Sequence, residues 1–260
     1  MYSLKRFPPS VKSAKYIADY WHFRSAAAEA AEIRVFPDSY FSVIFDLNSP
    51  ENTFITGTMN RSVKNLIDGG SRLFGVQLRP FLVPCLLKDS AAGFVNCVLP
   101  ADFIRGRVGE ICGKLKNCRT EDEMAAAAES LLLPVLEHAG VENNVFRRVS
   151  EAMLKGSAPA TVRETAFLAG ISEKQLERYF MFHTGLGVKE FGLLTAFERS
   201  CRMLENGSSS TLCAHSLRFY DQPHFIKNFR RFSGMTPTEY LNVGFLQYSS
   251  RTSGYDSAVR

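Results

Sequence analysis

The 260-residue sequence lacks an apolar run long enough to cross a membrane. A membrane-spanning helix needs about 20 apolar residues in succession, and no run approaches about 18. The N-terminus also lacks the charged-then-apolar pattern of a secretory signal. We therefore expect a cytoplasmic protein with no membrane partner.

The sequence has no cysteine pair or Cys/His cluster at the spacing that binds zinc. We therefore expect no metal site and no cofactor, and we interpret the cysteines as buried thiols. They are Cys85, Cys97, Cys112, Cys118, Cys201 and Cys213. Cys112 and Cys118, separated by five residues, leave a redox-sensor interpretation open.

Residues 1–105 also lack a catalytic dyad and a phosphate-binding loop, so we expect no enzyme activity.

Charge is distributed unevenly along the chain. Residues 1–144 carry 16 basic and 16 acidic side chains, whereas residues 145–242 carry 13 basic and 9 acidic ones. A positive excess suits a segment that contacts phosphates, although an excess of this size indicates little by itself.

Residues 221–234 carry the signals of one short helix with two different faces. Asp221 is a typical N-cap, Pro223 fits the first turn, and Gly234 can end the helix in the left-handed conformation. At about 100° per residue, one stripe is aromatic and the opposite stripe is polar. The aromatic stripe holds Phe225, Phe229 and Phe232, and the polar stripe holds His224, Lys227, Asn228 and Arg231. The polar face is either an ordinary solvated surface or a binding surface.

The flanking residues complete a helix-turn-helix pattern. Residues 214–219 indicate a short helix and residues 220–221 a turn, so the helix that follows is the one that would enter a DNA major groove. Thr236 and Glu239 then form a capping box that opens a further helix, with Pro237 at its first position.

The same pattern occurs earlier in the chain, where residues 166–172 indicate a helix, a glycine turn and an N-cap. The offset between the copies is 48 residues before the turn and 49 after it. The matched pairs are Ala166 with Ala214, Ser172 with Asp221, Leu176 with Phe225, Arg178 with Lys227, Phe180 with Phe229, Gly185 with Gly234, and Phe191 with Tyr240. A duplicated motif arises by chance far less readily than a single copy.

Residues 145–241 thus resemble the tandem DNA-binding domain of AraC-family transcriptional regulators. The family hallmark is a Gly-x-x-Pro-x-x-Tyr pattern after the second recognition helix, here at Gly234, Pro237 and Tyr240. Two positions depart from the family. Arg218 stands where the second turn usually has Gly, and Val188 stands where the first copy usually has Pro. We expect Arg218 to disturb close helix packing and to adjust that turn locally.

The resemblance implies a sequence-specific regulator whose partners are double-stranded DNA and RNA polymerase. Residues near the start and middle of each recognition helix would reach base edges, which Lys, Arg, Gln and Asn side chains can match. These residues are Lys174, Gln175 and Arg178 in the first copy, and Gln222, His224, Lys227 and Asn228 in the second. Arg230 and Arg231 are expected at phosphates, and His224 could instead make a phosphate or local bond. A rigid helix over residues 193–204 would hold the recognition helices about 34 Å apart, in successive major-groove segments.

Residues 1–105 are expected to form a separate β-rich domain. Residues 40–47 and 72–78 predict strands, residues 52–59 are a third candidate, and residues 16–23 indicate a helix or a strand. The segment resembles an uncharacterised domain found in front of AraC-type modules. The landmarks are Tyr20, Trp21, Pro37, Asp38, Thr56, Gly57, Gly75, Val76, Arg79 and Pro80. The resemblance implies sensing of a small-molecule effector or self-association as a homodimer.

Aromatic side chains and one arginine could line a ligand pocket in this domain. Trp21 and Tyr40, with Phe41 and Phe45, would form its walls, and Arg79 would receive an anionic ligand. The competing interpretation is that the aromatic residues form the core and that Arg79 pairs with a local carboxylate or carbonyl.

The sequence therefore predicts an α+β protein: a β-rich N-terminal domain over residues 1–105, a helical connector over 106–140 and an all-α domain with two helix-turn-helix motifs over 141–244. Residues 101–118 and 121–138 are helical segments that either pack on the β-rich domain or form a dimer seam. Residues 245–260 have no periodicity and are expected to form a loose tail.

Three function classes are compatible with the sequence. The leading one is a DNA-binding regulator gated by its N-terminal domain through a small ligand. The second is a regulator controlled by a protein partner without a small ligand. The third is a cysteine-based DNA repair protein, against which the absence of a cysteine–zinc cluster and of an activated-cysteine motif argues.

Overall fold

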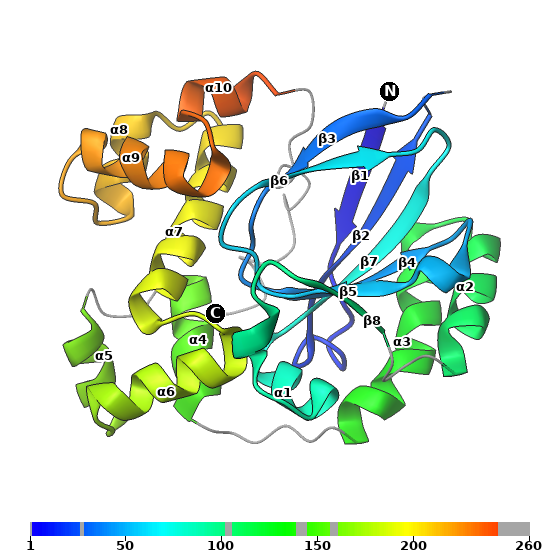
Figure 1. Ribbon diagram of the computed structural model, residues 1–260, viewed down its shortest axis with the longest axis horizontal. Coiled ribbons are helices and arrows are strands. Elements are labelled where there is room, and N and C mark those ends of the chain that lie inside the picture. Colours follow the sequence, from blue (N-terminus) through cyan, green and yellow to red (C-terminus); the bar gives the residue numbers. More distant parts are fainter. Residues whose placement is uncertain (1, 27–28, 102–105, 139–144, 157–160, 244–260) are drawn as a thin grey trace.

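The N-terminal half of the computed structural model is built on an antiparallel sheet (Figure 1). The structure describes residues 2–26, 29–101, 106–138, 145–156 and 161–243. A six-stranded sheet has the order β1-β2-β7-β4-β5-β8. Its strands are β1 (Tyr2–Phe7), β2 (Ile17–Ser25), β4 (Phe41–Asp46), β5 (Phe54–Thr56), β7 (Arg72–Leu78) and β8 (Val98–Pro100). A separate ribbon pairs β3 (Ala31–Val35) with β6 (Val63–Ile67).

The centre of the six-stranded sheet is an aromatic core. Phe74 on β7 lies opposite Phe45 on β4, and its ring is stacked 5.7 Å from the ring of Tyr20 on β2. On β7, Gly75 pairs with Trp21, and a Cβ atom at Gly75 would lie only 1.9 Å from the indole ring. The side chain of Trp21 therefore requires glycine at the neighbouring position of β7.

Two helices follow the sheet in the chain and pack against the N-terminal half. α2 (Val108–Asn117) buries Ile111 and Leu115, and α3 (Glu121–His138) lies along the segment that joins β1 to β2. Glu129 of α3 accepts hydrogen bonds of 2.6 Å from the hydroxyl groups of both Ser10 and Ser13. These bonds fix the β1–β2 connection to the helix.

The C-terminal half is entirely helical in the described ranges. The helices of the C-terminal half are α4 (Val145–Lys155), α5 (Val162–Ala169), α6 (Glu173–Thr184), α7 (Val188–Glu205), α8 (Ser210–Ser216), α9 (Gln222–Ser233) and α10 (Pro237–Leu241). The short helix α1 (Val83–Leu87) belongs to the N-terminal half. The long helix α7 joins the α5–α6 pair at one end to the α8–α9 pair at the other (Figure 1). The predicted α+β class, with its strands in the N-terminal half and its helices in the C-terminal half, is confirmed.

Some element boundaries differ from the sequence-based expectation. The segment over residues 16–23 is a strand, whereas the strand expected over residues 52–59 is limited to β5. The helix expected from residue 101 begins at Val108, with residues 102–105 outside the described ranges. The helix expected over residues 214–219 ends at Ser216, because Arg218 adopts a left-handed conformation with φ 59°. The predicted tail lies outside the described residues, as does the domain boundary near residues 141–144.

None of the helices in the described part of the chain combines the length and apolar character that crossing a membrane requires.

Candidate nucleic-acid interface

Each recognition helix begins at a side chain that caps its backbone. The Ser172 hydroxyl accepts a hydrogen bond from the N–H of Gln175, and the Gln175 side chain accepts one from the N–H of Ser172, both at 3.2 Å. At α9, the carboxylate of Asp221 accepts from the N–H of His224 at 2.7 Å. The sequence-based assignment of both N-caps is therefore confirmed, and each helix start is held in a fixed position.

The inward face of α9 is aromatic, as its sequence pattern predicts. Phe225, Phe229 and Phe232 are each 1% exposed. The ring of Phe229 lies 5.0 Å from that of Phe197 on α7. On α6, the equivalent residues Leu176 and Phe180 are also fully buried. These contacts hold both recognition helices against α7 with a defined rotation.

The opposite faces of the two helices carry the residues that we expect to contact DNA. Exposed side chains on α6 are Lys174, Gln175 and Arg178, and exposed side chains on α9 are Gln222, His224, Lys227, Arg230 and Arg231. Asn228 is partly exposed. Both polar faces are therefore accessible on the protein surface, and which of these side chains reach bases stays a prediction.

Several of these side chains already have partners within the protein. Arg231 forms a 2.8 Å ion pair with Glu190 of α7. Asn228 donates to the carbonyl of His224 at 3.0 Å, and Gln222 accepts from the Thr211 hydroxyl at 3.1 Å. In the described structure, neither Arg178 nor Lys227 makes a hydrogen bond or an ion pair within the protein. These two equivalent side chains are therefore available for a base contact.

The turns of the two helix-turn-helix motifs begin with the same backbone geometry, although the second turn is one residue longer. Gly170 has φ 71° and Arg218 has φ 59°, and each N–H donates at 3.1 Å to the residue three positions earlier. The local adjustment of the backbone expected at Arg218 is therefore wrong. The Arg218 side chain is exposed and does not lie between the helices. A residue at this position must therefore adopt the left-handed backbone conformation, but it does not need to be small.

The second departure from the family pattern makes a bond that proline could not make. Val188 is the first residue of α7, and its N–H donates to the carboxylate of Glu177 on α6 at 3.1 Å. Proline has no N–H, so this hydrogen bond between α6 and the connecting helix α7 requires a residue other than proline at position 188. At the start of α5, the Thr161 side chain caps the helix without forming a full capping box. Its hydroxyl caps Glu164, whose carboxylate accepts from that hydroxyl and not from the backbone.

The proposed ligand-binding residues of the N-terminal half lie in different settings. Trp21 packs over Gly75, Tyr40 is buried, and Arg79 donates to the carbonyl of Ala14 at 2.8 Å.

A cleft of about 280 Å³ lies elsewhere, between the start of α2 and the loops around β5 and β8. It is lined by Pro50, Glu51, Thr53, Pro100, Ala101, Val108 and Gly109. No sequence pattern indicates this cleft, because its walls come from three separate segments.

The buried-thiol interpretation of the cysteines is correct for Cys112, Cys201 and Cys213 and wrong for Cys85 and Cys97, which are exposed. Burial raises the pKa of the Cys112 thiol and also that of Cys118. A redox sensor needs a ready thiolate, so the raised pKa values disfavour that interpretation. Within the described ranges, no group of three or more His, Cys, Asp or Glu side chains could hold a metal ion.

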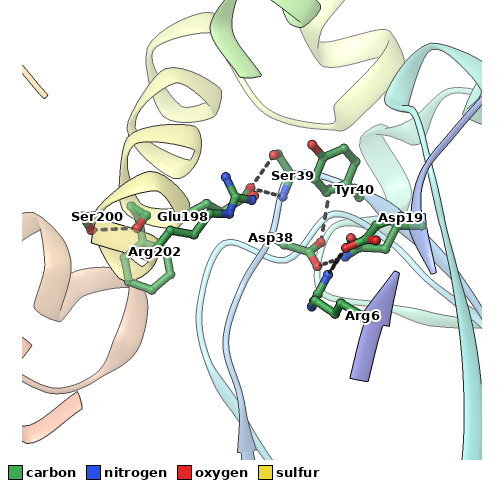
Figure 2. Close-up of polar contacts among 10 residues, drawn as sticks. Arg6, Asp19, Asp38, Ser39, Tyr40, Glu198, Ser200 and Arg202 are labelled. Atoms are coloured by element: carbon green, nitrogen blue, oxygen red, sulfur yellow. Dashed lines mark hydrogen bonds and ion pairs between the residues drawn. The ribbon is translucent and has the colours of Figure 1, made fainter. Parts of the chain in front are cut away.

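A buried carboxylate joins the two halves of the chain. Glu198 of α7 points toward the loop before β4, where it accepts hydrogen bonds from the N–H of Ser39 at 2.6 Å and from the Ser39 hydroxyl (Figure 2). Glu198 is 2% exposed and also forms a 3.4 Å ion pair with Arg202 on the next turn of α7. The junction is therefore polar, buried and charge-balanced.

The residue before Ser39 continues the polar contacts into the sheet. Asp38 accepts from the side chain of Gln77 at 2.6 Å, and Gln77 accepts from Arg6 at 3.0 Å (Figure 2 shows Asp38 and Arg6). Arg6 is buried and forms a 3.0 Å ion pair with Asp19. A continuous set of hydrogen bonds thus extends from the edge strand β1 to the loop that holds the connecting helix.

Comparison with known proteins assigns both halves. Residues 5–100 match the model of a domain of unknown function, DUF6597, and residues 165–242 match the model of a helix-turn-helix domain. No curated protein sequence matches the chain.

Solved structures with a related arrangement include two of ToxT from Vibrio cholerae and one of the AraC-like transcriptional activator CuxR. A ToxT structure at 1.65 Å has 10% identity and a TM-score of 0.46, covering 93% of this chain and 97% of ToxT. ToxT with a bound unsaturated fatty acid has 11% identity and a TM-score of 0.44, covering 93% and 94%. CuxR has 13% identity and a TM-score of 0.28, covering 78% and 86%.

The helix-turn-helix match includes both recognition helices, and the match to DUF6597 includes the sheet from the middle of β1 onward. The duplicated turns and the Gly-x-x-Pro-x-x-Tyr residues after α9 lie within the matched helical segment. The chain therefore carries a DUF6597 domain followed by an AraC-type helix-turn-helix DNA-binding domain.

Proposed function

We propose that this protein reads two successive major-groove segments of its DNA site and that its N-terminal domain gates this activity in response to a small ligand. The observation that carries the first part is the presence of two equivalent polar faces, on α6 and α9, at the two ends of α7. The Arg178 and Lys227 side chains occupy matched positions on these faces. A helix of this kind reads bases by placing such side chains in the groove.

Support for gating comes from the loop before β4. Ser39 of this loop bonds to Glu198 of α7, and Tyr40 donates its N–H to Asp38 at 3.1 Å. A ligand that contacted Tyr40 would therefore act one residue away from the bond to the connecting helix. To gate DNA binding, the ligand must bind the DNA-competent and incompetent states with different affinity. The ligand would also contact Trp21 and Arg79. RNA polymerase and a second copy of the chain are the further partners that we propose for the protein.

The test is selection of DNA by the full-length protein from a randomised duplex pool, followed by a salt titration on the selected site. We expect one motif spanning two major-groove segments. Arg178→Ala and Lys227→Ala should each weaken binding to that site by about 1–3 kcal/mol and relax the sequence choice in one segment. Arg230→Ala should weaken binding to all sequences equally and reduce the salt slope by about 1.

Lys116→Ala, which removes an exposed lysine from α2, is the matched control and should leave binding unchanged. An equal loss on all sequences for Arg178→Ala and Lys227→Ala would reassign these residues to phosphate contacts. Selection of no sequence by the full-length protein would contradict the proposed reading of DNA.

A further inference from the structure

The two recognition helices end in the same local structure. α6 ends at Thr184 and α9 ends at Ser233, and these hydroxyl groups donate to the carbonyls of Phe180 at 2.7 Å and Phe229 at 2.8 Å. A left-handed glycine follows each helix, with φ 72° at Gly185 and 77° at Gly234. These glycines are equivalent points of the duplicated motif, and both lie against the N-terminal domain.

The end of α9 is hydrogen-bonded to the β3–β6 ribbon. The N–H of Ser62 donates to the carbonyl of Phe232 at 2.8 Å, and its hydroxyl donates to the carbonyl of Ser233 at 2.7 Å. Arg34 donates to the same Ser233 carbonyl at 3.3 Å. The last carbonyls of a helix have no partner within the helix, so the ribbon supplies the donors that they require.

The end of α6 is packed against a short 3-10 helix, Ala91–Phe94, and the residue after it. A Cβ atom at Gly185 would lie 2.3 Å from a methyl group of Val95 and 2.8 Å from the carbonyl of Ala91. The backbone of the first motif therefore touches the N-terminal domain directly. Glycine is required here both for the left-handed conformation and for this close approach.

Between these two ends, the N-terminal domain also holds the connecting helix and the helix after α9. Ser39 bonds to Glu198 near the middle of α7. The ring of Phe36 lies 4.9 Å from that of Tyr240 on α10, in an edge-to-face arrangement with both side chains buried. The N-terminal domain is therefore attached to both motifs and to the helix that joins them.

We infer that the N-terminal domain acts together with α7 to fix the separation and relative rotation of α6 and α9, and that Arg34 and Ser62 are positioning residues that select the number of base pairs between the two segments. The inference rests on the proposed reading of two segments. Adding one base pair to B-DNA moves the second segment by about 3.4 Å and rotates it by about 35°. A change of this size would break the Ser62 bonds to α9 or the contact between Val95 and Gly185.

The experiment measures affinity of the full-length protein for the selected site with its original spacer and with one base pair removed or added. We expect the unmodified protein to lose about tenfold or more at either altered spacer. The variant Arg34→Ala/Ser62→Ala should bind the original spacer within about twofold of the unmodified protein and lose less than about threefold at the altered ones. Val95→Ala, which loosens the contact with Gly185, should likewise reduce the loss of affinity at the altered spacers.

Lys64→Ala is the matched control, because Lys64 lies on the same ribbon and its side chain forms a 2.7 Å ion pair with Glu32 of β3. Its spacer preference should equal that of the unmodified protein. The inference is overturned if Arg34→Ala/Ser62→Ala retains the original spacer preference, or if it binds all spacers more tightly by the same factor. Selection of no site by the unmodified protein would instead reject the proposed function, and the inference with it.

Discussion

The carboxylate of Glu198 holds the backbone N–H of Ser39 at 2.6 Å, although 159 positions separate the two residues in the chain. The bond crosses from the connecting helix of the DNA-binding domain to the loop before β4 (Figure 2). Because Glu198 is 2% exposed, water cannot replace it as the acceptor for the Ser39 N–H. This side chain therefore contributes to the placement of α7 against the N-terminal half.

Replacing Glu198 by alanine should lower the free energy of unfolding by about 3 kcal/mol, because it leaves the buried N–H and hydroxyl of Ser39 without their acceptor and removes the ion pair with Arg202. Urea unfolding followed by circular dichroism measures the change. Glu151→Ala is the control, because Glu151 also pairs with an arginine four residues away but on a more exposed face. Its effect should stay within about 0.5 kcal/mol. Equal effects of the two variants would show that the Ser39 bond contributes nothing.

The turn of the second helix-turn-helix motif should become more stable when Arg218 is replaced by glycine. Arg218 is held at φ 59°, a conformation that costs a non-glycine residue about 1–2 kcal/mol. Glycine removes that cost but adds backbone entropy to the unfolded chain, so the expected net gain is about 0.5–1 kcal/mol. Thermal unfolding of the variant should show a higher melting temperature.

The equivalent position of the first motif supplies the reverse experiment. A Cβ atom at Gly170 would meet no atom within 4 Å, so Gly170→Ala tests the backbone conformation without a steric clash. This variant should lose about 1 kcal/mol. A gain in stability for Gly170→Ala, or a loss for Arg218→Gly, would contradict the shared left-handed geometry of the two turns.

Acidification should destabilise the C-terminal half through His183. The imidazole ring is 7% exposed and stacks on the ring of Phe146 at 4.1 Å. Burial lowers the pKa of His183 to about 4, from the usual 6.5. The unfolded chain therefore binds a proton more readily, so the stability is complete above about pH 6.5 and is lost as the pH falls toward 4. Between pH 7 and 5, we expect a loss of about 2 kcal/mol from this residue.

His22 of the N-terminal half contributes in the same direction, because burial and the charges of Arg24 and Arg72 lower its pKa to about 4. The variant His183→Phe keeps a stacked ring but cannot titrate. Urea unfolding at pH 7, 6 and 5 should therefore show a pH dependence about half as steep in His183→Phe as in the unmodified protein. An unchanged slope would mean that His183 is accessible to protons in the folded state.

Local signals in the sequence predicted much of the C-terminal half. The caps at Ser172 and Asp221 and the buried stripe of Phe225, Phe229 and Phe232 depend on residues within one helix, so their spacing determines them. Alignment of the two copies also placed Arg218 opposite Gly170. It did not show that the arginine would keep the backbone conformation of the glycine, because the alignment compares residue types and not dihedral angles.

Contacts between distant segments could not be predicted in this way. Nothing near Glu198 marks it as the partner of Ser39, and the same acidic side chain on a helix surface would ordinarily face water. The exposure of Cys85 and Cys97 is a further case, since cysteine is usually buried and their positions depend on how distant segments pack. The attachment of Ser62 to the end of α9 likewise depends on tertiary structure alone.

The aromatic core beneath the second recognition helix should be the most sensitive site in the C-terminal half. The ring of Phe229 lies within 5.8 Å of the rings of Phe197, Phe225 and Tyr240, and it is 1% exposed. Phe229→Ala should lower the free energy of unfolding by about 3–5 kcal/mol, because these surrounding rings cannot close the cavity. Thermal unfolding followed by circular dichroism measures the change.

Phe167→Ala is the control for this variant, because it deletes the same side chain from a helix of the first motif where it is 81% exposed. Its effect should stay within about 0.5 kcal/mol. Phe229→Ala should also weaken DNA binding, since α9 presents Lys227 only while its aromatic face is fixed on α7. An unchanged melting temperature for Phe229→Ala would mean that α9 is rotated about its axis. The polar stripe with Lys227 would then not face outward, and the assignment of DNA-contacting residues on α9 would be wrong.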